Sequence, residues 1–326
     1  MKTVLLANQP TKTTRLLLFQ ETLTSLGHEV IIPSFRSTSW IAVAREAGSI
    51  IRSERPDIVH VFNVPDIIYR KIPAMKGIYF DRLIYDYRSP WGVEMQMLTW
   101  LPGRVFGEHY EKILARAADL ITTVNSPLGA KVRLYLLDNE VPVRVIPNYP
   151  SKTFTEIESG SSSGAVLFVG RISSQEGVGN LVNLAKSMPD QEFWVVGGGP
   201  LSSWYFMRKP RNIRLMGWQP HAEVARLIKR AKICIVPRVE NVLTPYSTDR
   251  SVWKLNEYLN LGKQVVASGI TLEEERKNLR VTTSSRLEEI LREEIGKVAL
   301  PLDSGDYRFW EGNREAIKDV YDQVSS

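Results

Sequence analysis

The stretch that decides the fold is YSTDRSVWKLNEYLNLGKQVVAS, residues 246–268. Polar and apolar residues recur at helical spacing between Lys254 and Leu261, and Gly262 ends that pattern. Residues 264–267 continue as an apolar run of strand length. A loop, a helix and a buried strand in succession are typical of an α/β protein with a parallel sheet.

Two acids stand eight residues apart near the start of this predicted helix, Asp249 and Glu257. An ionised carboxylate only accepts hydrogen bonds, so a carboxylate where a strand edge meets a helix suits the hydroxyls of a sugar or a ribose. The alternative interpretation is an amphipathic helix whose charges are simply solvated.

The segment NEYLNLGKQVVAS, residues 256–268, resembles the corresponding segment of retaining nucleotide-sugar glycosyltransferases of family 4. Their signature is a pair of acids separated by seven residues, which Asp249 and Glu257 match in spacing. The family usually has Glu in the first position, followed by an aromatic residue and a glycine, whereas this chain has Asp249 followed by RSV. The resemblance implies the GT-B fold, with two Rossmann-like domains whose parallel sheets face across a cleft. It also implies that Glu257 holds the ribose hydroxyls of the donor and Asp249 the sugar end.

Length and composition fit such a chain. It has 326 residues, 43% hydrophobic and 24% charged, which suits two soluble domains with real cores. The net charge of +6 and the pI of about 9.3 favour anionic partners, but no run of Lys and Arg indicates nucleic acid. The single cysteine, Cys234, lies in an apolar run and fits a reducing compartment. The N-terminus is predicted to be a strand and not a signal peptide, and no apolar run reaches the roughly 18 residues of a membrane span.

Apolar runs alternate with helical patterns along both halves of the chain, which predicts parallel strands at 4–7, 29–33, 57–62, 83–87, 120–124, 143–146, 165–169, 193–196, 212–216, 233–237 and 264–267. Segments such as RPDIVHVFN, YDYRSPW and VRVIPNYPSKTF resemble the first domain of the same family. We therefore expect a Rossmann-like acceptor domain at 1–150, a polar linker at 151–164 and a donor domain at 165–305. By analogy with GT-B proteins, a helix at 306–326 is expected to cross back to the first domain.

The turn at Gly170 and Arg171 follows a predicted strand and precedes a helix, a position that favours phosphate. The family has this Arg and a Lys five residues later, both on the donor diphosphate, but here the later residue is Glu176. We weigh three outcomes: Lys254 supplies the missing cation, Arg250 supplies it, or donor binding has been lost. The first is favoured, because KLNEYLNLGK resembles a variant found in the family with Lys at this position.

Further donor contacts are expected at other strand ends. The run VVGGGP resembles the family's glycine turn, in which the backbone approaches the nucleotide, and assigns Gly198 and Gly199 to the site. The segment after the strand at 233–237 should lie beside the base or sugar, which adds Pro237. Leu255, beside Lys254 in the predicted helix, is also assigned to the nucleotide site by the resemblance.

In the first half, Asp86 and Arg88 follow a strand at the edge where α/β sheets bind ligands. By analogy this edge faces the acceptor, so that Asp86 would orient a hydroxyl and Arg88 a phosphate; a buried ion pair explains both residues equally well. Residues 91–106, WGVEMQMLTWLPGRVF, form an apolar stretch with few charges, predicted to be a loop. Such a loop is either an internal lid or a surface that meets lipid or a partner protein.

The sequence therefore predicts a metal-independent hexosyltransferase without a cofactor, in which Arg171, Lys254, Asp249 and Asp86 are the catalytic candidates. Its expected partners are a nucleotide-diphosphate sugar and a glycan or lipid-linked acceptor. Its expected location is the cytoplasm, with peripheral contact to the inner face of the membrane. The alternatives are a catalytically silent subunit of a glycosyltransferase complex and, less favoured, a nucleotide-sugar epimerase on the same fold.

Overall fold

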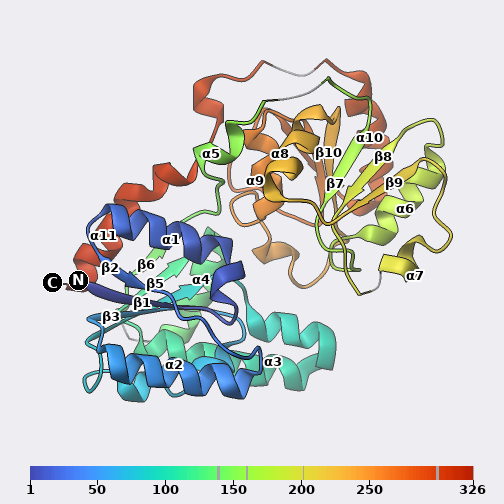
Figure 1. The fold of residues 1–326 in the computed structure, drawn as a ribbon. Coiled ribbons are helices and arrows are strands. Elements are labelled where there is room, and N and C mark those ends of the chain that lie inside the picture. Colours follow the sequence, from blue (N-terminus) through green and yellow to red (C-terminus); the bar gives the residue numbers. More distant parts are fainter. Residues whose placement is uncertain (138–139, 159–160, 201, 299–300, 326) are drawn as a thin grey trace. The chain divides into compact units, whose positions relative to one another are not determined.

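Two parallel six-stranded sheets organise the chain, and each belongs to its own structural unit (Figure 1). The computed structural model describes residues 1–137, 140–158, 161–200, 202–298 and 301–325. Unit 1 consists of Met1–Asn148 and Glu311–Ser326, and unit 2 of Tyr149–Trp310. The predicted α/β class with two Rossmann-like domains is confirmed.

The sheet of unit 1 has the strand order β2-β1-β3-β4-β5-β6, and every neighbouring pair is parallel. Its strands are β1 (Lys2–Leu6), β2 (Glu29–Ile31), β3 (Ile58–Phe62), β4 (Arg82–Tyr87), β5 (Leu120–Thr123) and β6 (Val143–Val145). The central strands β3 and β4 are buried on both faces, which explains their continuous apolar runs.

Helices cover both faces of this first sheet. They are α1 (Thr14–Ser25), α2 (Trp40–Glu54), α3 (Trp91–Ala117), α4 (Ser126–Leu136) and α11 (Arg314–Ser325). Figure 1 shows α1 and α11 on one face and α2 and α3 on the other. Although α11 follows unit 2 in sequence, it packs against α1 and β4, and the Tyr321 hydroxyl lies 2.7 Å from His60 Nδ1. The last residue of the predicted C-terminal helix, Ser326, lies outside the described residues.

The prediction of a loop at 91–106 is wrong, because these residues belong to α3. Non-helical backbone angles at Thr99 and Trp100 divide α3 into two helical arms. The arms fold back on each other so closely that a Cβ on Gly107 would lie 2.5 Å from the Cα of Gly92. Glycine at these contacts lets the two arms pack backbone to backbone, a tertiary effect that outweighs the loop-like composition.

The sheet of unit 2 has the order β12-β11-β10-β7-β8-β9, again entirely parallel. Its strands are β7 (Val166–Val169), β8 (Phe193–Val196), β9 (Ile213–Gly217), β10 (Ile233–Pro237), β11 (Val265–Ser268) and β12 (Leu279–Thr282). Its helices are α5 (Lys152–Thr155), α6 (Val178–Ser187), α7 (Ser202–Phe206), α8 (His221–Arg230), α9 (Trp253–Asn260) and α10 (Leu287–Gly296). The sequence patterns left β12 and α10 unassigned.

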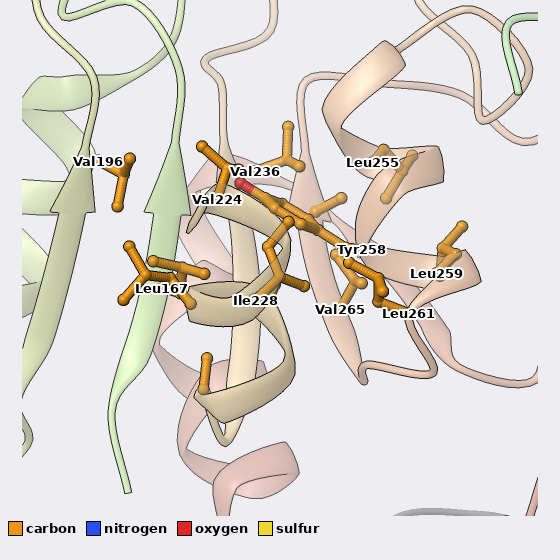
Figure 2. Close-up of a cluster of buried hydrophobic side chains, with 14 of the residues drawn as sticks. Leu167, Val196, Val224, Ile228, Val236, Leu255, Tyr258, Leu259, Leu261 and Val265 are labelled. Carbon is orange, nitrogen blue, oxygen red and sulfur yellow. The ribbon is translucent and has the colours of Figure 1, made fainter. Parts of the chain in front are cut away.

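Two hydrophobic clusters, one formed with α8 and α9 and the other with α6 and α10, hold unit 2 together. Figure 2 shows Tyr258 of α9 lying among apolar side chains such as Val224 and Val236. Its hydroxyl accepts a 2.7 Å hydrogen bond from the backbone N–H of Val169, the last residue of β7. Helix α9 is therefore held at the carboxyl end of β7, where the candidate site begins.

The boundary between the units differs from the predicted one. It falls between Asn148 and Tyr149, ahead of the expected linker at 151–164. Part of that segment forms α5, whose Phe154 is buried in the core of unit 2, while residues 159–160 lie outside the described chain. Unit 2 begins and ends at neighbouring points, because Trp310 N–H donates a 2.9 Å hydrogen bond to the Pro150 carbonyl.

Candidate functional site

The strand order of unit 2 reverses direction between β7 and β10. From β7 the chain first builds outward through β8 and β9, then returns to β10 on the other side of β7. The helices that follow the two strands, α6 and α9, pack in different hydrophobic clusters, and open α/β sheets bind ligands at the carboxyl ends of the strands at such a reversal. Gly170 follows β7 at this edge and Pro237 is the last residue of β10.

Close backbone contacts at this edge require glycine. The φ of Gly197 is +125°, and a Cβ on it would lie 2.0 Å from the Gly170 carbonyl oxygen. The φ of Gly177 is +74°, and a Cβ there would lie 1.8 Å from the carbonyl oxygen of Pro237. Glycine at these positions therefore lets neighbouring backbone segments pass closely at the carboxyl edge of the sheet, which we call the ligand edge, with no side chains between them. The predicted residues Gly198 and Gly199 belong to the same edge.

Three charged side chains meet between β7 and β10, and we call Glu176, Arg238 and Lys254 the charge cluster. Glu176 Oε2 lies 2.5 Å from Lys254 Nζ, and Oε1 lies 2.8 Å from Arg238 Nη2. The Lys254 ammonium also lies 4.3 Å from the centre of the Phe168 ring, a cation–π contact. A Cβ on Gly170 would come within 3.0 Å of Lys254 Nζ, so the cluster lies beside the end of β7.

The charge cluster is held mainly out of water and has a net charge of +1. Burial alone would raise the pKa of Glu176, but Lys254 and Arg238 outweigh it and lower that pKa to about 2. Burial lowers the pKa of Lys254 despite the neighbouring carboxylate. We therefore treat Glu176 as ionised at neutral pH, holding two cations at the ligand edge.

The structure distinguishes between Lys254 and Arg250, the two residues that the sequence offered as the missing cation. Lys254 reaches the turn at Gly170, whereas Arg250 is engaged elsewhere, in an ion pair with Glu274. The sequence placed the segment that begins with Arg238 beside the donor but gave this arginine no role in the site. Arg171 is exposed and forms no ion pair with any residue in the described parts of the chain.

Glu257 has one carboxylate oxygen engaged and one available. Its Oε1 accepts a 3.0 Å hydrogen bond from Trp253 Nε1 and lies 2.8 Å from His221 Nε2. The hydrogen bond with Glu257 raises the pKa of His221. No described residue donates a hydrogen bond to Oε2, so this oxygen can accept hydroxyl donors from a ligand. Leu255, one of the predicted contacts, instead points into the hydrophobic core (Figure 2).

The other predicted acid of unit 2, Asp249, is fully buried. Its Oδ1 accepts a 2.6 Å hydrogen bond from the backbone N–H of Glu273, and burial raises its pKa. Its main-chain carbonyl accepts a 2.7 Å hydrogen bond from Asn256 Nδ2 of α9. In this arrangement the side chain fastens the loop after β11, and its Oδ2 is buried with no hydrogen-bond partner among the described residues.

Asp86 of unit 1 has a structural partner that the sequence did not indicate. Its two carboxylate oxygens each accept a 2.8 Å hydrogen bond from Arg15 of α1, and Thr122 Oγ1 donates a third at 2.7 Å. Burial opposes ionisation, yet Arg15 and these hydrogen bonds lower the pKa of Asp86. The buried ion pair is therefore real, but it involves Arg15 and not Arg88, whose Nε donates to the Asn63 carbonyl at 2.8 Å.

The junction between the arms of α3 presents a large exposed apolar surface on unit 1. Trp100 is 82% exposed and Leu98 76% exposed, and they are joined by Met97, Leu101, Val105 and Phe106. In the described parts of the chain, no helix has the length and apolar character needed to cross a bilayer. Across the same residues, no group of three or more His, Cys, Asp or Glu side chains is placed to hold a metal ion.

Comparison with known proteins gives structural matches only. No family model matches the sequence, and no curated protein matches it. Among solved structures, the chain is similar to a sucrose-phosphate synthase from Thermosynechococcus elongatus, with a TM-score of 0.70, 14% identity, and coverage of 99% of this chain and 98% of that one. It is also similar to a glycosyltransferase from Rickettsia africae ESF-5, with a TM-score of 0.60, 14% identity, and coverage of 98% and 93%.

A third similar structure is the UDP-GlcNAc 2-epimerase of Methanocaldococcus jannaschii, solved in complex with UDP-GlcNAc and UDP. Its TM-score is 0.60 at 9% identity, and the match covers 98% of this chain and 99% of that one. At such low identities these matches show the fold and no more. The chain has two Rossmann-like units, as in the GT-B fold.

Proposed function

We propose that this protein is a glycosyltransferase that moves a sugar from a nucleotide-diphosphate donor to a hydroxyl of a glycan or lipid-linked acceptor. The charge cluster beside Gly170, at the point where the strand order of unit 2 reverses, is the observation that carries this proposal. Two cations beside glycine-lined backbone form a site suited to a diphosphate. The free Oε2 of Glu257 stands one helical turn after Lys254 and suits the two hydroxyls of a ribose.

In the proposed reaction, the bond between the sugar and the donor diphosphate breaks and negative charge develops on the leaving phosphate. Lys254, Arg238 and the exposed Arg171 stabilise that charge without a metal ion. Glu176 keeps the first two cations in place before the donor arrives. The resemblance of residues 256–268 to the retaining family supports transfer with retention of anomeric configuration, which an NMR assignment of the product linkage tests directly.

We propose that unit 1 presents the acceptor side, and that the exposed apolar surface at the junction of the α3 arms contacts a membrane peripherally from the cytoplasmic side. Trp100 and its apolar neighbours support this proposal, because amphipathic aromatic side chains favour the bilayer interface. Sedimentation with vesicles containing anionic lipid should deplete the wild-type protein from solution. A Trp100→Ser variant that sediments to the same extent would contradict membrane contact through this surface.

The donor proposal is tested by a thermal-shift panel of UDP, GDP, ADP, dTDP and CMP with their common sugar conjugates, with and without magnesium. A ligand at 100 times its Kd stabilises the folded protein by about 2.7 kcal/mol. We expect one nucleotide to raise the Tm without magnesium, and the shift to be lost in Glu257→Gln and Lys254→Met. Lys186→Met, at an exposed position on α6, is the control and should keep the full shift.

A flat panel would refute donor binding and favour the alternative, a silent subunit of a larger glycosyltransferase complex. Turnover of the donor to an isomer without an acceptor would instead identify an epimerase. Both outcomes differ from the expected one, in which donor consumption requires an acceptor.

A further inference from the structure

An exposed surface without a role in the proposed reaction lies where α7 leads into β9. Trp204 of α7 is 65% exposed, and Met207, directly after that helix, is 72% exposed. Leu215 of β9 is 45% exposed. Three exposed apolar side chains on one short segment are typical of an interaction surface. We call these three residues, together with the neighbouring Arg208, Lys209 and Arg211, the α7 surface.

The apolar side chains of the α7 surface are held on one face of the second sheet. Leu215 pairs with Val195 of β8, and Val195 belongs to the hydrophobic cluster formed with α6. Paired residues of neighbouring strands point to the same face, so Leu215 lies on the α6 face. The buried Phe206 anchors α7 in the same cluster, and α7 packs against α6 (Figure 1). The cluster therefore fixes both elements that carry the exposed apolar residues.

Hydrogen bonds fix the turn between α7 and β9. Lys209 Nζ donates a 2.8 Å hydrogen bond to the Ile213 carbonyl, and the Ile213 N–H donates one of 3.2 Å to the Pro210 carbonyl. The Trp204 ring stands edge-on to Tyr205, with 4.9 Å between the ring centres. The exposed tryptophan is therefore carried by an ordered segment, so presenting it to a partner costs little conformational entropy.

The charges of the α7 surface all have the same sign. Residues 193–222 contain four Lys or Arg residues and no Asp or Glu, and α6 contains no acidic residue either. Arg208 and Arg211 are exposed, and neither forms an ion pair with a residue in the described parts of the chain. Elsewhere on unit 2, exposed arginines such as Arg226 and Arg292 are paired with nearby glutamates. The α7 surface therefore suits a partner that supplies negative charge.

We propose that the α7 surface binds the interface of a bilayer that contains anionic lipid. Trp204 and Met207 enter the boundary between headgroups and acyl chains, where aromatic and apolar side chains gain from leaving water. Arg208 and Arg211 lie beside lipid phosphates, which supply the missing negative charge. A nucleic acid would pair with the arginines but would offer no apolar partner for Met207 and Leu215. This surface belongs to unit 2, is distinct from the apolar surface at the junction of the α3 arms, and does not depend on the proposed reaction.

A local fluorescent probe tests this proposal. The chain has one cysteine, Cys234, which is fully buried, so a new surface cysteine can be labelled selectively. Ser203→Cys in α7 carries the environment-sensitive dye NBD at an exposed position beside Trp204. Its emission should shift to the blue with vesicles of phosphatidylcholine and phosphatidylglycerol, and stay unchanged with phosphatidylcholine alone. Arg226→Cys on α8 is the matched control and should show no shift, because α8 packs on the opposite face of the sheet, as the alternate residues of β7 in the two clusters show.

The contribution of the arginines is measured by titrating the labelled Ser203→Cys protein with the mixed vesicles. Arg208→Gln/Arg211→Gln should weaken partitioning by roughly 10- to 30-fold, the effect expected of two basic residues near an anionic membrane surface. Arg226→Gln/Lys232→Gln removes the same charge from exposed positions of unit 2 outside the α7 surface and should leave partitioning nearly unchanged. Because the dye reports only its own surroundings, contact through the exposed apolar surface of unit 1 does not produce the signal.

Several results would overturn membrane binding through the α7 surface. An absent blue shift at position 203, or an equal shift at positions 203 and 226, would show that α7 does not enter the bilayer. Equal losses in the two double variants would show that net charge, and not the α7 surface, drives binding. A shift with single-stranded DNA but not with vesicles would assign the surface to nucleic acid. Failure of donor binding would refute the proposed function and leave all of these measurements unaffected.

Discussion

Replacement of Glu176 by Gln removes the carboxylate that holds the charge cluster together. The ordinary pKa of a glutamate, 4.5, falls to about 2 at this position. That difference corresponds to about 3 kcal/mol in favour of the folded protein with Glu176 ionised. Burial of the Lys254 ammonium opposes this gain, and the amide of Gln still forms hydrogen bonds. We therefore expect Glu176→Gln to lower the free energy of unfolding by about 2–3 kcal/mol.

Differential scanning calorimetry at pH 7 measures this loss. For a domain of the size of unit 2, about 2–3 kcal/mol corresponds to a fall in Tm of roughly 5–10 °C. Glu288→Gln is the control, because Glu288 forms an exposed pair with Arg292 within α10 and should leave the Tm unchanged.

The pH dependence of the stability difference between wild type and Glu176→Gln distinguishes the electrostatic contribution of Glu176 from its packing contribution. Since folding lowers the pKa of Glu176, its contribution is fully present above the unfolded pKa and is lost as the pH falls toward the folded value of about 2. The stability difference between wild type and Glu176→Gln should be constant above about pH 5.5, and about three-fifths of the charge contribution should remain at pH 3.5. Equal Tm values at pH 7, or a difference that stays constant down to pH 3.5, would refute the electrostatic account.

Two further predictions concern backbone contact and buried charge, both measured by urea unfolding. Gly177→Ala places a Cβ 1.8 Å from the Pro237 carbonyl oxygen at a φ of +74°, and should cost about 2–4 kcal/mol. Its control, Gly179→Ala, meets no atom within 4 Å inside α6 and should gain about 0.5–1 kcal/mol; equal midpoints for the two variants would contradict the close contact. Asp86→Asn leaves the buried Arg15 without its carboxylate and should cost about 3–5 kcal/mol, so an unchanged midpoint would show that the pair contributes little.

Sequence periodicity predicted every strand except β12 and most helices, because those patterns are local. Apolar runs at strand length and the helical spacing after Lys254 recur in the structure as β11 and α9. Residues 91–106 were assigned wrongly, because the contact of Gly92 with Gly107 is not visible as a period. Composition alone could not distinguish a pair of packed helical arms from an apolar loop.

Local sequence patterns could not predict which side chains contact each other at the candidate site. Glu176 and Arg238 are 62 residues apart in sequence, and Arg15 and Asp86 are 71 apart. The strand order sets which of these residues meet, and the sequence predicted parallel sheets without their order. Lys254 was the exception, since a segment resemblance pointed to it before its proximity to Gly170 was known.

The hydrogen bond between Trp310 and Pro150 bears on the order in which the two units are completed during synthesis. Unit 2 is one uninterrupted segment whose ends meet, whereas unit 1 needs α11, and Tyr321 of that helix reaches His60 across 261 residues of sequence. During synthesis, unit 2 is complete before unit 1 receives its last helix. Until then the surface of α1 and β4 that Tyr321 covers stays open, so the nascent first unit is the part that exposes apolar surface to chaperones.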